Sequence, residues 1–430
     1  MPRQHRPYRP KARGCFQCSQ RRIDCDRNGP CCKKCLSRGM QCSGLGVRYR
    51  FNDGMAARGR QAGKTAESVF GSSKLATVES DDQSTTVPED RASSQAGELV
   101  LHHQPSPTAL DPWAVYLIRY FSENIACSMQ AIDGQHNGYR HLLLPIAHRS
   151  PLVLAPVLAT AAFHMARLET ADRSSGLWSS SRLYGQALAE LQVQRDLEKA
   201  DASTRLHILL ALLTLLVSVM VNGSDDFPMI FRLLVSALNA MGGEEALGHD
   251  ELATFIVRQI HKMRVYAAPF LSEEDGVAVL SCEAYTTHAL DCLRFCSQQQ
   301  PDLSAGVPII ESLIQQAYDI YLSQAFTDML DIETQDPTFR VKRFKDTLEL
   351  FPPGAPGEQV LIWATFVAAS DSLLAEHQTF FRHLLWRLYE MTGFANIVRG
   401  IEQLENIWER RQYPGNRWTS MLPVLRAFVM

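Results

Sequence analysis

Six cysteines near the amino terminus repeat one spacing pattern twice. In each copy, two residues separate the first two cysteines and six residues separate the second from the third. The six positions are Cys15, Cys18, Cys25, Cys32, Cys35 and Cys42. A C-x2-C pair can hold one metal ion from a tight turn, and structural zinc takes four ligands in a tetrahedron. Six thiolates can satisfy two such ions only if two of the sulfurs bridge. The count therefore predicts one binuclear cluster rather than two independent fingers.

The rest of the sequence favours metal binding by these thiols over disulfide formation. The chain opens with basic and polar residues and has no apolar signal-peptide core. We therefore expect a reducing compartment, in which clustered thiols act as metal ligands. A small disulfide module is the alternative, and it would require export that the sequence does not support.

Charge is divided unevenly along the chain. Residues 1–50 hold 13 Lys and Arg against two acidic residues, a net charge of +11. The other 380 residues hold 30 basic and 44 acidic residues, a net charge of -14. This asymmetry indicates that residues 1–50 bind a polyanion, which the acidic remainder of the chain would repel.

The segment from Cys15 to Cys42 resembles the fungal Zn2Cys6 binuclear cluster domain of transcription regulators. The resemblance implies two Zn2+ ions and a bridging role for the first and fourth cysteines, Cys15 and Cys32. One ion would then be held by Cys15, Cys18, Cys25 and Cys32, and the other by Cys15, Cys32, Cys35 and Cys42. So small a segment has almost no apolar core, and structural zinc supplies roughly 10–16 kcal/mol of folding free energy in such domains.

Cys31 offers a competing ligand next to Cys32. With Cys35 it would form C-x3-C, whereas Cys32 forms the same C-x2-C as the first half. Pro30 supports Cys32, because the family that the segment resembles commonly has a proline two residues before its fourth cysteine. We therefore leave Cys31 outside the ligand set.

The resemblance also implies how the cluster would read DNA. A short helix is expected after Cys18, and the third and fourth residues beyond that cysteine, Arg21 and Arg22, would read a CGG-like triplet in the major groove. The arginine fork matches guanine because it can donate to O6 and N7 together. Contact with phosphates alone is the alternative for both arginines. Asp24 stands where the family often has a basic residue, so affinity or half-site preference is expected to differ.

Other basic residues around the cluster are predicted to contact the DNA backbone. Lys33, Lys34 and Arg38 lie in the second half of the cysteine pattern. Lys11 and Arg13 belong to a basic segment before the first cysteine. This segment could contact the minor groove or phosphates, and it could also serve as a nuclear import signal. The alternative is a solvated tail without a specific role. Arg48 and Arg50 follow the last cysteine, in the region where the linker of the resembled family runs along the DNA backbone.

Three zones follow from composition: a DNA-binding domain at 1–50, a disordered linker at 51–110 and an all-helical regulatory domain at 111–430. The linker is rich in small polar residues and cannot bury enough apolar surface to order itself. The linker shows no sustained heptad pattern, so no coiled coil is evident there. The resemblance still permits a homodimer. Asp111-Pro112 predicts a helix start.

The third zone has strong helical periodicity. Apolar stripes appear at Leu183–Leu191, Phe380–Leu388 and Ile397–Trp408, and Gly242-Gly243, Pro352-Pro353-Gly354 and Pro414-Gly415 predict breaks between helices. The apolar run 206–221 is shorter than the roughly 20 residues of a membrane span, which favours a buried core helix.

The third zone also resembles the fungal-specific transcription factor domain, which implies an all-α regulatory fold. The resemblance rests on 142–168, on 184–191 and on the late segment Ile407-Trp408-Glu409-Arg410-Arg411. Pro156 departs from the expected helical run and predicts a kink. Cys282, Cys292 and Cys296 favour buried structural thiols over a redox or metal sensor.

Together these features predict a nuclear, sequence-specific DNA-binding regulator of RNA polymerase II transcription, with double-stranded DNA and co-regulators as partners. No HExxH, GxSxG or phosphate-loop motif is present, so an enzyme is not expected. Regulators of the resembled family often control biosynthetic gene clusters, which makes a metabolic or secondary-metabolite cluster the expected target. The alternatives are a zinc-dependent protein-interaction module and a metabolite-sensing co-regulator.

Overall fold

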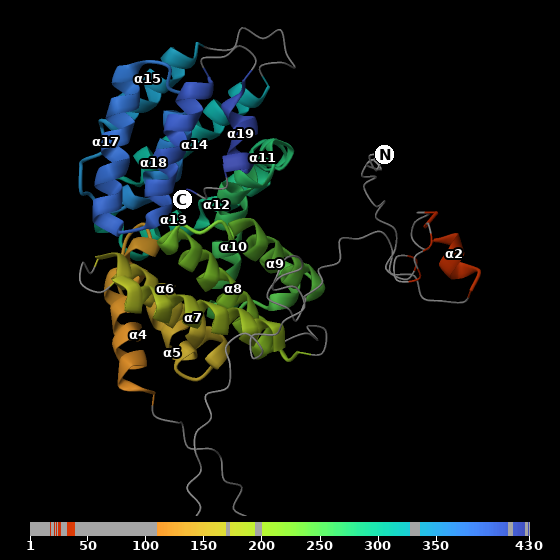
Figure 1. The fold of residues 1–430 in the computed structure, drawn as a ribbon. Coiled ribbons are helices and arrows are strands. Elements are labelled where there is room, and N and C mark those ends of the chain that lie inside the picture. Colours follow the sequence, from red (N-terminus) through yellow and green to blue (C-terminus); the bar gives the residue numbers. More distant parts are fainter. Residues whose placement is uncertain are drawn as a thin grey trace, which may run out of the picture. The chain divides into compact units, whose positions relative to one another are not determined.

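A computed structural model describes residues 18, 21, 23, 25, 26, 32–38, 110–168, 173–193, 200–326, 336–411, 416–425 and 429. The chain divides into two units, Met1–Val100 and Leu101–Met430 (Figure 1). Of the predicted linker, only Leu110 falls among the described residues, so the boundaries at 51 and 110 stay a prediction.

Unit 2 is helical throughout its described ranges, which contain no strand and confirm the all-helical prediction there. Its first half holds α4 (Pro112–Asn124), η1 (Ala126–Met129), η2 (Tyr139–Leu143), α5 (Leu144–Ala147), α6 (Pro151–Leu168), α7 (Arg173–Val193), α8 (Ala202–Asn222), α9 (Phe227–Ala240), η3 (Glu244–Leu247) and α10 (Glu251–Leu271). Its second half holds α11 (Glu273–Leu280), α12 (Glu283–Ala289), α13 (Asp291–Gln299), η4 (Pro301–Leu303), α14 (Val307–Ala325), α15 (Pro337–Leu348), η5 (Glu358–Leu361), α16 (Ile362–Ser370), α17 (Ala375–Thr392), α18 (Ala395–Arg410) and α19 (Trp418–Leu425).

The core of unit 2 is built around α8. Every residue from Ile208 to Val221 is buried, as expected for a helix that is apolar on all sides. The Asp201 side chain accepts a hydrogen bond from the Thr204 N–H at the start of α8, and Gly223 ends the helix with φ 68°. By length and composition α8 could cross a membrane, but 83% of its most apolar stretch is buried inside the unit. The helix is therefore a core helix, as its sequence predicts.

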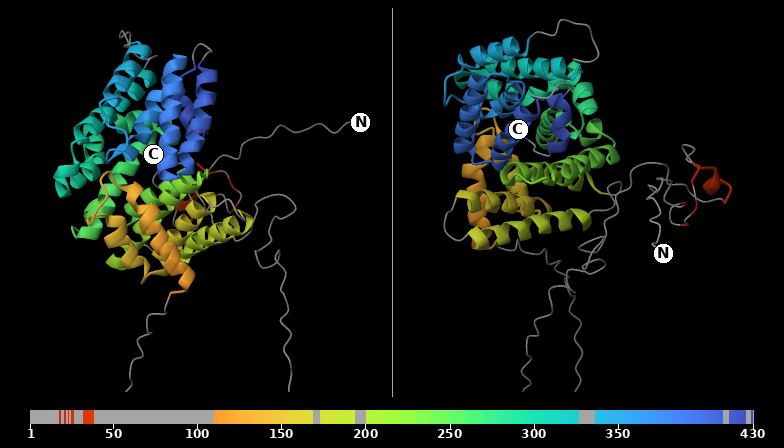
Figure 2. Two further views of the ribbon diagram at one scale, coloured as in Figure 1. Left: turned by 90° about the vertical axis from the view of Figure 1, so that its left-hand side faces the viewer. Right: turned by 45° about the horizontal axis from the view of Figure 1, so that its top comes forward.

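The other helices surround α8 and α10. Helices α6, α9 and α18 pack on α8, while α11, α12, α13 and α19 pack on α10. Figures 1 and 2 show α4 to α7 at one end of the unit and α14 to α19 at the other, with α8 to α10 between them. This arrangement buries a single apolar cluster that reaches from α4 to α19.

A buried ion cluster joins the late segment to the rest of unit 2. Asp371, fully buried after α16, accepts hydrogen bonds from Arg340 Nε at 2.5 Å, Arg411 at 3.2 Å and the Trp418 indole N–H at 3.0 Å. The Trp408 indole donates to the Ala369 carbonyl at 2.8 Å. The late segment that carries the family resemblance therefore anchors α18 to the end of α16.

The three predicted apolar stripes lie on the core faces of α7, α17 and α18. Gly242-Gly243 separates α9 from η3, and the predicted break at 352–354 separates α15 from η5. Pro414-Gly415 lies outside the described residues. The helix α6 continues through Pro156, and the kink expected there stays a prediction. A bend of 119° lies earlier, between Tyr139–Ala147 and Pro151–Arg167.

Candidate metal centre and nucleic-acid interface

In unit 1, a single helical turn sets the spacing of two thiols. Cys32 is the N-cap of α2 (Lys33–Leu36), and Cys35 lies within that turn. The Cys35 and Leu36 N–H groups both donate to the Cys32 carbonyl, at 3.1 and 3.0 Å. Because one helical turn brings residues three apart onto the same side, the C-x2-C spacing places both sulfurs on one face.

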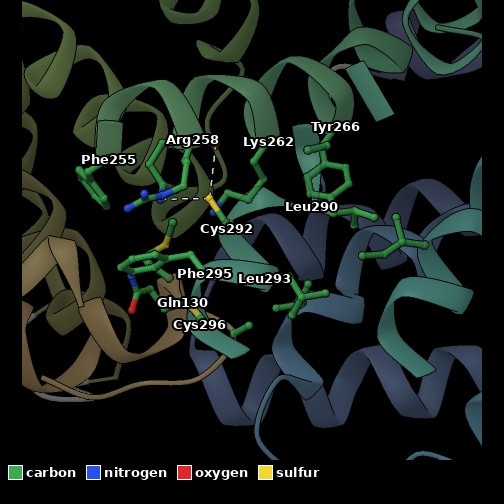
Figure 3. A pocket seen from close by; sticks show the side chains of 16 residues that line it. Gln130, Phe255, Arg258, Lys262, Tyr266, Leu290, Cys292, Leu293, Phe295 and Cys296 are labelled. Atoms are coloured by element: carbon green, nitrogen blue, oxygen red, sulfur yellow. Dashed lines mark hydrogen bonds between the residues drawn. The ribbon is translucent and has the colours of Figure 1, made fainter. Parts of the chain in front are cut away.

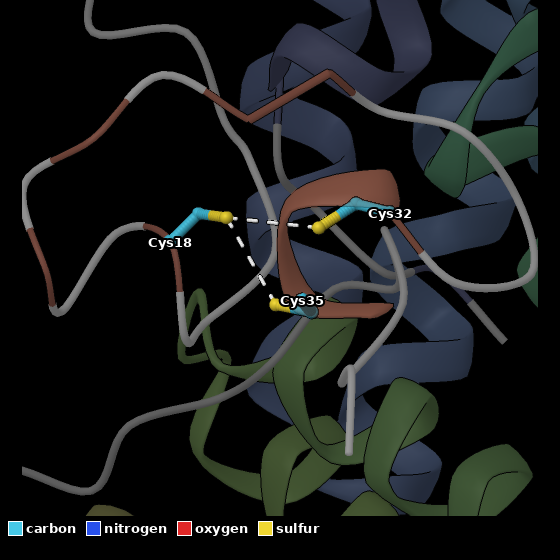
Figure 4. Close-up of side chains that lie close together, drawn as sticks. All are labelled: Cys18, Cys32 and Cys35. Atoms are coloured by element: carbon cyan, nitrogen blue, oxygen red, sulfur yellow. Dashed lines mark hydrogen bonds between the residues drawn. The ribbon is translucent and has the colours of Figure 1, made fainter. Parts of the chain in front are cut away.

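Three buried sulfurs converge at this turn. Cys18 Sγ lies 3.6 Å from Cys32 Sγ and 4.0 Å from Cys35 Sγ, and each residue is at most 1% exposed (Figure 4). These distances far exceed a disulfide bond of about 2.05 Å. A tetrahedral zinc with bonds of about 2.3 Å holds its sulfurs roughly 3.8 Å apart. The donor set and its spacing therefore fit a thiolate-bound zinc ion.

Cys32 lies where two groups of potential ligands meet. One group is Cys18, Cys32 and Cys35, and the other is Cys25, Asp26 and Cys32. A sulfur shared by two groups suits the bridging role that the resemblance gives to Cys32. The same resemblance assigns Cys18 and Cys35 to different ions, although their sulfurs lie close together here. Cys15, Cys42 and Cys31 lie outside the described residues.

Asp26 is a functional residue that the sequence analysis did not identify. Its Oδ2 accepts from the Lys33 N–H at 2.8 Å and its Oδ1 from the Lys34 N–H at 3.4 Å, which caps the start of α2. The Lys33 N–H bond lowers the pKa of the exposed Asp26 carboxyl. An acidic residue near the first orphan N–H groups of a helix is a capping signal. The cap was missed because Asp26 and α2 are separated by the loop to Cys32.

Four predicted DNA contacts lie among the described residues. Lys33 and Lys34 are exposed on α2, Arg38 is exposed just after it, and Arg21 is half-buried three residues after Cys18. Asp26 binds the backbone N–H groups of Lys33 and Lys34, and both residues are exposed. The other predicted contacts, Arg22, Arg13, Lys11, Arg48 and Arg50, lie outside the described residues.

Unit 2 contains a separate small cavity of about 40 Å³ between α10 and α13 (Figure 3). Arg258 and Lys262 reach it from α10, and Cys292 and Phe295 reach it from α13. Arg258 stacks on the Phe295 ring at 4.0 Å, and no described carboxylate forms an ion pair with Arg258 or Lys262. The Gln130 Oε1 atom is buried without a described hydrogen-bond partner. Among the described residues, the cavity thus combines two cations that form no ion pair with one acceptor that has no hydrogen-bond partner.

Two of the four cysteines of unit 2, Cys292 and Cys296, behave as inert thiols. Burial raises the pKa of both Cys292 and Cys296, so both stay protonated at neutral pH. Cys292 Sγ lies 3.4 Å from the Arg258 carbonyl and 3.4 Å from Gln259 Nε2. Cys296 is buried as predicted, whereas Cys292 and Cys282 are only partly exposed to solvent and not fully buried; Cys282 is the N-cap of α12.

The family model described as fungal specific transcription factor domain matches two overlapping stretches, 116–266 and 245–426. The chain belongs to this family. The two stretches span unit 2 from α4 to α19, so the predicted resemblance of the helical zone is confirmed. No curated protein and no solved structure matches the chain.

Family membership indicates that this chain is a transcription regulator. The matched stretches include both the buried cluster at Asp371 and the cavity at Arg258. The cysteine-rich segment lies outside them and rests on its own spacing and geometry.

Proposed function

We propose that this protein is a nuclear, sequence-specific DNA-binding regulator of RNA polymerase II transcription. Two Zn2+ ions held by Cys15, Cys18, Cys25, Cys32, Cys35 and Cys42 would fold the first 50 residues. The observation that carries the proposal is the convergence of Cys18, Cys32 and Cys35 at zinc-like spacing beside the exposed Lys33 and Lys34.

The zinc ions would act structurally, by fixing the two halves of the cysteine pattern against each other. The helix after Cys18 would then present Arg21 and Arg22 to a CGG-like half-site, while Lys33, Lys34 and Arg38 neutralise phosphates. The acidic helical unit would stay off the DNA and receive co-regulators. The pathway class that suits such a regulator is a metabolic or secondary-metabolite gene cluster.

Replacement of Arg22 by Ala tests the base-reading role. Binding of the full chain to a CGG-containing duplex should weaken by roughly 5- to 150-fold, the equivalent of about 1–3 kcal/mol for a lost bidentate contact. Binding to a random duplex should weaken much less. Equal losses on both duplexes would leave the CGG preference unchanged, which would make Arg22 a phosphate contact and contradict its base-reading role.

A zinc-dependent protein-interaction module remains the alternative from another class. That module would bind CGG-containing and random duplexes equally and only as weakly as a basic peptide of the same charge. The same gel-shift series therefore separates the two functions.

A second candidate function, metabolite sensing by unit 2, is favoured by the cavity at Arg258 and Lys262. A water needs roughly 10–15 Å³, so about 40 Å³ admits a ligand group of only a few heavy atoms. The two cations suit a carboxylate, and a neighbouring hydroxyl or amine could donate to Gln130 Oε1.

Acetate, lactate and pyruvate serve as probes of this second function. One of them should raise the melting temperature of the full chain, because a ligand that binds only the folded state stabilises it. Lys262→Gln should remove the increase, and Lys342→Gln, a change at an exposed site on α15, should keep it. If the melting temperature rises equally in wild type, Lys262→Gln and Lys342→Gln, or rises in none of them, a carboxylate site here would be contradicted.

A further inference from the structure

Two histidines and an aspartate from three helices meet in unit 2. His261 lies on α10, His288 on α12 and Asp291 at the start of α13, and one potential ligand atom of each lies within 4.8 Å of the other two. We propose that these three side chains form a zinc site in the helical unit, separate from the cysteine cluster.

Two of the three ligand atoms already have suitable spacing. His288 Nδ1 lies 3.0 Å from Asp291 Oδ2. A tetrahedral zinc with bonds of about 2.0–2.1 Å separates its nitrogen and oxygen ligands by roughly 3.3 Å. The metal would replace the hydrogen bond between these side chains, and His288, with 55% of its side chain exposed, has room to rotate.

The third ligand, His261, is oriented by a carboxylate on its far side. His261 Nε2 lies 2.6 Å from Glu244 Oε2, and Arg264 holds the other Glu244 oxygen at 3.0 Å. The remaining ring nitrogen, His261 Nδ1, is buried and has no described hydrogen-bond partner. Histidines that bind metals commonly donate their other N–H to a carboxylate, which leaves the free nitrogen as the ligand. This arrangement gives the unsatisfied Nδ1 a function.

The surrounding charges leave one Asp291 oxygen available. Arg294 lies 3.8 Å from Asp291 Oδ1 and 3.3 Å from Glu311, so it occupies the opposite side of the carboxylate from Oδ2. Two imidazoles and one carboxylate suit Zn2+, and a water completes the fourth position where His288 is open to solvent. A bound ion would fasten α12 and the start of α13 to α10.

The test measures zinc in the full chain after equilibrium dialysis against a buffer of micromolar free Zn2+. Wild-type protein should retain about one equivalent more than His288→Gln. The control His249→Gln, which changes an exposed histidine on the loop before α10, should match wild type. Equal zinc content in wild type and His288→Gln would overturn the proposal and leave only hydrogen-bonded side-chain pairs. Asp291→Asn provides a second variant with the same expected loss.

Cobalt substitution separates this site from the cysteine cluster. The equivalent lost in His288→Gln should lack the sulfur-to-cobalt charge-transfer band that thiolate ligands produce. Cys18→Ser should weaken that band and keep the histidine-dependent equivalent. If the thiolate band fails to appear while the histidine-dependent equivalent persists, the proposed DNA-binding cluster fails and the site in unit 2 stands.

Discussion

The two units of this transcription factor bury opposite kinds of residue. Among the described residues of unit 1, the buried ones are Cys18, Cys32 and Cys35. Unit 2 buries large aromatic and aliphatic side chains, with Trp363, Trp418 and Phe381 among those that are fully enclosed. Unit 2 is therefore stabilised by the removal of apolar surface from water, whereas unit 1 would be stabilised by the zinc ions that we propose for its cysteines.

The difference also concerns what each unit exposes. In the described part of unit 1 the buried residues are cysteines, and Lys33, Lys34 and Arg38 are exposed. Unit 2 instead has room for a cavity and a buried ion cluster. Changes that remove a metal ligand and changes that disturb the core should therefore act on different units.

The largest effect is expected from Cys32→Ser. Loss of a bridging thiolate should release both ions of the cluster, which in such domains contribute about 10–16 kcal/mol to folding. Specific DNA binding should disappear, while the melting temperature of unit 2 stays unchanged. Metal analysis and a gel shift on the same sample check this. The neighbouring change Cys31→Ser is the matched control; if it removes zinc and Cys32→Ser does not, the ligand assignment is wrong.

The next largest effect is expected from Asp371→Ala, which acts on unit 2 alone. Arg340 and Arg411 are 7% and 9% exposed, so both cations would lose a buried partner, at a cost of about 3–5 kcal/mol. Burial lowers the pKa of Arg411 and the Asp371 charge opposes that shift, so removal of the carboxylate leaves the guanidinium poorly compensated.

Denaturant unfolding of the full chain measures this loss. Asp346→Ala removes an exposed carboxylate that pairs with Lys342 and should cost less than about 1 kcal/mol. Zinc content should be unchanged in both variants. Similar costs for the two changes would show that the cluster at Asp371 contributes little to the core.

A smaller effect is expected from Lys33→Ala on the salt dependence of DNA binding. One phosphate contact fewer should reduce the slope of log affinity against log salt by about 0.9. The preference for CGG over a random duplex should be retained. A lost preference with an unchanged slope would place Lys33 on a base instead of a phosphate.

The smallest effect concerns pH and His164 in unit 2. Burial lowers the pKa of His164, whose ring lies 2.9 Å from the Tyr120 hydroxyl and 2.8 Å from the Thr392 carbonyl. The unfolded chain therefore takes up the proton first. The contribution of neutral His164 to the free energy of unfolding is complete above about pH 6.5, the pKa of histidine in the unfolded chain. It is lost as the pH falls toward the lower pKa of His164 in the folded protein.

Unfolding of wild type and His164→Gln between pH 5 and about 8 measures this loss. The difference in free energy of unfolding between wild type and His164→Gln should be largest at high pH and should decrease as the pH falls. A difference that increases on acidification would mean that the folded protein favours the charged ring.

Local features could be read from the sequence, and long-range ones could not. The C-x2-C spacing is consistent with Cys32 and Cys35 lying on one helical turn, and Ile397, Ile401 and Leu404 follow the period of α18. Asp371 meets Arg340 and Arg411 across 31 and 40 residues, a contact that no period encodes. Asp26 and the cavity at Lys262 were missed for the same reason.

We propose that zinc folds residues 1–50 and thereby enables sequence-specific DNA binding. A gel shift of the full chain on a CGG-containing duplex and on a scrambled duplex, before chelation, after chelation and after return of Zn2+, tests it most directly. We expect chelation to abolish the CGG-specific shift and Zn2+, but not Mg2+, to restore it. A CGG-specific shift that survives complete removal of zinc would contradict the account.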